Sequence, residues 1–177
     1  MNISYLWASL IALAFYLPSC EAIDNLKFEG ELVKEPCVIA PGDEAISLDF
    51  GSIIDKQLYA HERTESQDFA IHLINCDITM AKTVHIALSG TASNGLPGYL
   101  AVTGSEADAG LAIGLENALS GEPISINSQT EQNISLTAGS TDIRIRAFLR
   151  AEPEALVHKT IVRGAFSGIL NFSLRYD

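Results

Sequence analysis

Residues 166–176 read FSGILNFSLRY, and this stretch decides the fold class. Every second residue is apolar or glycine, which is the period of a β-strand with one buried face. The series runs to the penultimate residue, so no polar segment follows it. An apolar strand in this position aggregates unless another segment pairs with its edge. The inward face consists of Phe166, Gly168, Leu170, Phe172, Leu174 and Tyr176.

The same alternation occurs in segment after segment, separated by turn residues such as those at 41–43, 94–95 and 138–140. Short strands with one polar face indicate antiparallel sheets, and at this chain length they predict a sandwich or barrel. Short helical turns are expected only at residues 54–62 and 152–157, and no repeat or linker divides the chain. The predicted strands are centred on Ile46-Leu48-Phe50, Phe69-Ile71-Leu73, Val84-Ile86-Leu88, Leu111-Ile113-Leu115 and Ile143-Ile145-Ala147-Leu149.

An export signal is predicted at residues 1–22. The apolar run from Leu6 to Leu17 suits the core of a signal peptide and is too short to span a bilayer. Cleavage is expected after Ala22, where small residues occupy the two positions that a signal peptidase reads. Two alternatives remain open, a lipoprotein signal with lipid on Cys20 and an ordinary buried N-terminal helix.

Loss of Cys20 with the signal leaves an even pair of cysteines, Cys37 and Cys76. In an oxidising compartment this pair is expected to form one disulfide. The alternative is two buried free thiols.

A second strand pattern precedes the first of these cysteines. In residues 23–35, the apolar Leu26, Phe28 and Leu32 alternate with charged residues, and Gly30 falls in the same register. This segment is either a strand that pairs outside its own domain or an ordinary first strand of the domain.

Composition excludes several classes of function. The 22 acidic and 11 basic residues give a net charge of −11, which argues against a nucleic-acid partner. The four histidines, at positions 61, 72, 85 and 158, show no metal-ligand spacing, and no motif of a known catalytic site occurs. We therefore expect no enzyme activity, no catalytic residue, no metal and no cofactor.

Several features, taken in order along the chain, resemble those of chaperone–usher pilus subunits. They are the strand pattern at residues 28–32 followed by Pro36-Cys37, the LDFG element at 48–51, and the FAIHLINC strand at 69–76. Gly164, fourteen residues from the end, and the penultimate Tyr176 complete the resemblance. Residues 96–104 and 153–156 look most like those of minor adaptor subunits of P-type pili.

The resemblance implies an all-β, incomplete immunoglobulin-like β-sandwich that lacks its final strand. Residues 1–22 would be the signal peptide, 23–35 a donor-strand extension and 36–177 the pilin domain. The donor residues would be Leu26, Phe28, Gly30 and Leu32. An acceptor groove that also binds the chaperone would be formed by Gly164, Phe166, Gly168, Leu170, Phe172, Leu174 and Tyr176.

The partners implied are a periplasmic pilus chaperone, an outer-membrane usher and a neighbouring subunit on each side, with export through the periplasm to the cell surface. The resemblance favours a minor or adaptor subunit that polymerises by donor-strand exchange and supports cell adhesion. A terminating or anchoring subunit and a receptor-binding adhesin are the alternatives.

Overall fold

The computed structural model describes residues 28–30, 32, 34–104 and 109–177. Two compact units divide the chain, Met1–Lys34 and Glu35–Asp177, and the second contains every strand within the described ranges. The predicted signal peptide and the donor residue Leu26 lie outside the described residues.

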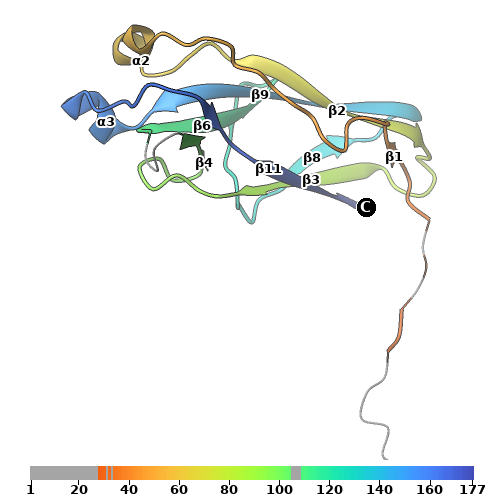
Figure 1. The fold of residues 1–177 in the computed structure, drawn as a ribbon. Helices are drawn as coiled ribbons and strands as arrows, with labels where there is room; N and C mark the ends of the chain where they lie inside the picture. The colour runs from red at the N-terminus through yellow and green to blue at the C-terminus, as the bar shows by residue number, and fades with distance from the viewer. Residues whose placement is uncertain (1–27, 31, 33, 105–108) are drawn as a thin grey trace, which may run out of the picture. The chain divides into compact units, whose positions relative to one another are not determined.

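Two main antiparallel sheets form the second unit (Figure 1). The larger sheet has the order β1 (Val38–Ile39), β2 (Gln67–Cys76), β9 (Gly139–Ala151), β6 (Leu111–Asn117) and β4 (Leu100–Ala101), and β7 (Pro123–Ile124) pairs with β6. The other main sheet has the order β11 (Leu170–Tyr176), β3 (Thr83–Gly90) and β8 (Gln132–Ser135). A separate pair joins β10 (Phe166–Ser167) to β5 (Thr103–Gly104).

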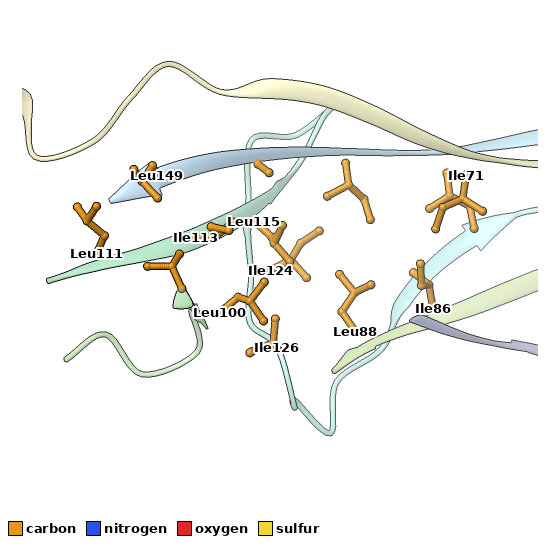
Figure 2. Packing of buried hydrophobic residues seen from close by; sticks show 14 of the residues in the cluster. Ile71, Ile86, Leu88, Leu100, Leu111, Ile113, Leu115, Ile124, Ile126 and Leu149 are labelled. Atoms are coloured by element: carbon orange, nitrogen blue, oxygen red, sulfur yellow. The ribbon is translucent and has the colours of Figure 1, made fainter. Parts of the chain in front are cut away.

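One hydrophobic core lies between the two main sheets (Figure 2). Ile71 and Ile143 project from the larger sheet, while Val84, Ile86 and Leu88 project from β3. Each of these residues is buried, and the residues between them along the strands are more exposed. The alternation in the sequence therefore predicted the inward faces of β2, β3 and β9 correctly, and the fold is the predicted sandwich. The predicted inward residues of β6 are also buried, but so is Ala112 between them, so this strand is buried on both faces.

Two short helices occur where helical turns were predicted. Helix α2 (Asp55–His61) is anchored by the buried side chain of Leu58, and α3 (Pro153–His158) by that of Ala155. Each helix ends at a residue in the left-handed region whose backbone N–H closes the last turn. Within the described ranges, no helix is both long enough and apolar enough to span a membrane.

The predicted strand at Ile46-Leu48-Phe50 is wrong. Residues 44–54, which we call the strap, belong to none of the strands found in the described part of the chain. Leu48 and Phe50 do pack against the core, so the alternation of apolar residues correctly predicted that one face of this segment is half-buried. A strand also needs a neighbour for its backbone hydrogen bonds, and alternation of side chains carries no information about that neighbour.

The C-terminal series is two strands rather than the single one predicted. The chain leaves β10 after Ser167, pairs with the other sheet from Leu170, and exposes 77% of Ile169 in between. A Cβ on Gly168 would lie only 3.0 Å from Ile113 and 3.1 Å from Leu100. Glycine therefore allows the close approach at which the chain changes sheets.

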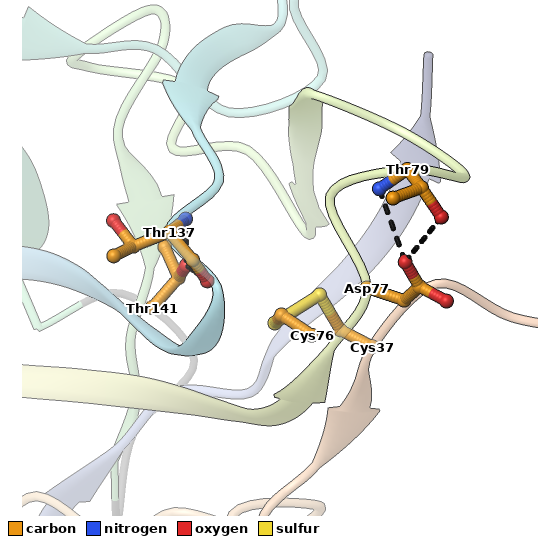
Figure 3. Close-up of a disulfide and its surroundings, with 6 residues drawn as sticks. All are labelled: Cys37, Cys76, Asp77, Thr79, Thr137 and Thr141. Carbon is orange, nitrogen blue, oxygen red and sulfur yellow. Dashed lines mark hydrogen bonds between the residues drawn. A yellow bond between two sulfur atoms is a disulfide. The ribbon is translucent and has the colours of Figure 1, made fainter.

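The predicted disulfide between Cys37 and Cys76 is confirmed (Figure 3). Cys37 lies immediately before β1, and Cys76 ends β2, which pairs with β1. Beside the bridge, the backbone N–H of Asp77 donates to the carbonyl oxygen of Pro36 at 2.8 Å. The start of the sheet unit is therefore tied covalently to one of its longest strands.

Replacing both cysteines, Cys37→Ser with Cys76→Ser, is expected to lower the free energy of unfolding by about 4 kcal/mol. The bridge closes a loop with a sequence separation of 39 residues, and opening it returns that conformational freedom to the unfolded chain. Urea unfolding of the chain with a bound peptide of residues 23–35, followed by circular dichroism, measures the loss. The unmodified chain measured in a reducing agent is the control, and it should show the same loss as the double variant. An unchanged unfolding midpoint in the double variant would contradict the prediction.

Candidate functional site

An open groove of about 760 Å³ runs between the strap and the C-terminal strands. Residues 44–51 of the strap form one wall, and residues 164–170 with Phe172 form the other. Both main sheets contribute to the floor. The floor residues are Phe69, Ile71, Leu88, Leu100, Ile113, Leu115 and Ala147.

The groove is open because neither wall has a strand partner on the side that faces it. Among the residues that the structure describes, β11 is an edge strand that pairs with β3 alone, and the strap pairs with no strand. Unpaired N–H and C=O groups of an extended edge are a template for another strand. The arrangement is that of a sandwich from which one strand is missing.

The chemistry of the groove is apolar. Of the described residues that line it, Glu44 and Asp49 alone have ionisable side chains, and both lie exposed on the strap. Beyond the groove, burial and the nearby charge of Glu35 raise the pKa of Tyr176, so this hydroxyl stays neutral over the physiological range. Within the described part of the chain, no three His, Cys, Asp or Glu side chains gather as a metal site. The groove therefore suits a segment that presents apolar side chains on one face.

Five of the seven predicted acceptor residues line this groove: Gly164, Phe166, Gly168, Leu170 and Phe172. Leu174 and Tyr176 do not line it. They lie opposite Ile86 and Val84 on β3 and pack against the core. Five of the predicted acceptor residues therefore lie at the groove and two lie farther along β11, and their role in strand and chaperone binding stays a prediction.

The other wall was missed by sequence reasoning. The signal was present, because Ile46, Leu48 and Phe50 alternate as the C-terminal series does. Phe50 contacts Phe166 across the groove, with their ring centroids 6.1 Å apart. Gly164, two residues before Phe166, has a φ of 150°, a conformation that other residues rarely adopt. At this glycine the chain enters the wall opposite the strap.

The candidate donor residues that the structure describes belong to the unit Met1–Lys34. Phe28 and Leu32 are 86% and 101% exposed, and nothing lies within 4 Å of where a Cβ on Gly30 would be. Neither these residues nor the described positions 29 and 34 form a strand. Large apolar side chains exposed in this way are typical of a segment that binds a partner.

Comparison with known proteins gives consistent matches. A family model described as fimbrial protein matches residues 26–177. The fimbrial adapter PapK of Escherichia coli is 28% identical over 155 residues, covering 86% of this chain and 87% of PapK.

Two solved structures are similar over most of the chain. The P pilus rod subunit PapA has a TM-score of 0.69 and 29% identity, covering 81% of this chain and 100% of that one. A chain from a chaperone–usher pilus, solved to explain rod uncoiling, has a TM-score of 0.69 and 28% identity, covering 89% of this chain and 97% of that one.

Proposed function

Because the chain belongs to the fimbrial protein family, as a structural subunit of a chaperone–usher pilus at the cell surface, we propose that it joins its neighbours by donor-strand exchange. Its fold is the incomplete immunoglobulin-like sandwich of such pilins, and it is not an enzyme. The observation that carries the proposal is the groove, whose two walls have no strand partner on the sides that face it and lie above an apolar floor.

A strand inserted between the strap and the C-terminal strands would complete the sandwich. Burying three large apolar side chains at about 1.5–3 kcal/mol each, together with new backbone hydrogen bonds, gives about 5–10 kcal/mol before ordering costs. Such a joint would be persistent without a covalent bond. In the periplasm, a chaperone would lend this strand, and at the usher the extension of the next subunit would replace it.

Residues 23–35 are the proposed donor to the preceding subunit. Phe28 and Leu32 are exposed and available for burial. Leu26, Phe28, Gly30 and Leu32 fall on one face of an extended strand, because side chains alternate with a period of two. Each subunit would therefore give one strand and receive one.

We further propose that the chain is a minor adaptor subunit that supports adhesion indirectly, as part of the fibre. The likeness of residues 96–104 and 153–156 to adaptor subunits and the match to PapK support this role. A rod subunit is the second candidate, favoured by the match to PapA. The open groove argues against a terminating subunit, which would receive no strand.

Counting the subunit in sheared fibres tests the adaptor role. An adaptor is expected at far fewer copies than the most abundant subunit and at discrete points in immunogold images. Quantitative mass spectrometry of purified fibres measures the ratio. Gold label along the whole fibre, with this chain as the most abundant protein, would instead establish the rod role.

A further inference from the structure

We infer that two carboxylates, Asp43 and Asp55, tether the ends of the strap and hold this wall ready for an incoming strand. The inference rests on the proposed function of the groove. It adds two positioning residues, and their partners, that lie outside the groove lining.

The strap needs such support because it forms no ladder of its own. Its inward residues Leu48 and Phe50 are only partly buried, and Ile46 is 39% exposed. Side-chain packing of this kind holds a segment close to the core but leaves its backbone free to shift. The contacts at its two ends therefore decide how well ordered the wall is.

Asp43 fixes the first end to β2. Its Oδ2 atom accepts a hydrogen bond from the backbone N–H of His72 at 2.6 Å and lies 2.7 Å from Nδ1 of the same residue. The backbone N–H of Ala40 also donates to the carbonyl oxygen of His72 at 2.8 Å. The strap thus begins at a fixed point on the larger sheet.

Asp55 fixes the second end to the opposite wall. Its Oδ2 atom accepts hydrogen bonds from Nε of Arg163 at 2.9 Å and from Nη2 at 2.5 Å. Asp55 is the first residue of α2, directly after the strap, and Arg163 directly precedes Gly164, where the other wall begins. This ion pair therefore joins the two walls at one end of the groove.

Two neighbouring contacts reinforce this end. The hydroxyl of Tyr59 on α2 accepts a hydrogen bond from the backbone N–H of Ile161 at 3.2 Å, and the rings of Phe50 and Phe166 meet across the groove.

Hydrogen bonds from His72 lower the pKa of Asp43, and hydrogen bonds from Arg163 lower the pKa of Asp55. The carboxylates of Asp43 and Asp55 are therefore both charged at neutral pH.

A wall held in place binds a strand more tightly, because less chain must be ordered when the strand pairs with it. Arg163 is 83% exposed and Asp55 is 20% exposed, so the ion pair is accessible to salt. We expect breaking it to weaken strand binding about two- to fivefold, the range typical of exposed pairs. Breaking both tethers should weaken binding by about the product of the two effects.

The test measures exchange of a synthetic peptide of residues 23–35 on the mature chain. The chain is prepared with unlabelled peptide, and replacement by a fluorescent copy is followed by anisotropy. Asp55→Asn, Arg163→Gln and Asp43→Asn should each raise the apparent Kd. Exchanging the partners, Asp55→Arg with Arg163→Asp, should restore most of the affinity, and 1 M salt should reduce the difference between Asp55→Asn and the unmodified chain.

Arg175→Gln is the matched control, because Arg175 is also an exposed, paired arginine but its partners are Glu131 and Asp177, outside the groove. Unchanged Kd values in the Asp55, Arg163 and Asp43 variants, or an equal loss in Arg175→Gln, would overturn the tether inference while leaving strand exchange intact. The peptide stands in for the extension of the next subunit, so if the unmodified chain takes up neither it nor the extension peptides of the other fibre subunits, the proposed function fails, and the inference fails with it.

Discussion

A chain of residues 36–177 alone is expected to self-associate and to lack a cooperative thermal transition, whereas adding a peptide of residues 23–35 should give a monomer. Without a strand, the apolar wall residues Leu48, Phe50, Phe166, Leu170 and Phe172 are only half-buried and border an open groove of about 760 Å³. Strand insertion contributes about 5–10 kcal/mol before ordering costs, which corresponds to tens of degrees in Tm for a domain of this size.

Size-exclusion chromatography and thermal melting with and without the peptide measure this effect. The control is the same peptide with Phe28→Asp and Leu32→Asp, which keeps the peptide backbone but removes the two exposed apolar side chains at these positions. A monodisperse chain that melts cooperatively without any peptide would contradict the incomplete-fold proposal.

Aspartate substitutions in the extension and in the groove wall are expected to fail at different stages of assembly. Phe28→Asp should leave the subunit intact in the periplasm, since the proposed chaperone contact is with the groove, but should keep it out of surface fibres. Phe172→Asp should remove the subunit from the periplasm. Phe172 packs against the core and lines the groove, so a carboxylate there costs several kcal/mol.

Immunoblots of periplasmic extracts and of sheared fibres quantify the two outcomes. Ser173→Asp is the matched control for the wall, because Ser173 is the next residue of β11 and is exposed. It should leave both pools near the unmodified level. Equal periplasmic loss of the Phe28→Asp and Phe172→Asp subunits would mean that the extension belongs to this domain's own core.

The sequence predicted those parts of the fold in which side-chain burial alone decides the structure. Alternation located β2, β3, β6 and β9 because one face of each is buried against the opposite sheet. Cysteine parity predicted the bridge between Cys37 and Cys76. The strands could be predicted from the local pattern of apolar residues, and the disulfide from the even number of cysteines left after the signal peptide.

The errors arose where pairing between distant segments decides the outcome. The strap has the side-chain pattern of a strand but no ladder partner, and the C-terminal series changes sheets at Gly168. The two tethers carried no sequence signal, since Asp55 and Arg163 lie 108 residues apart. For the same reason, the predicted acceptor residues came from the C-terminal side of the groove and included none of the strap.

The position of the disulfide also determines how tension would pass through a fibre. A pull on the segment before Cys37 would reach a two-residue strand first, and β1 alone would peel from the sheet under a small load. Because Cys37 is bonded to Cys76, the covalent path leads instead into β2, a ten-residue strand with a long ladder to β9. Hydrogen bonds spread along β2 would then share the load, and we expect the subunit to resist mechanical extension at the point where the force enters it.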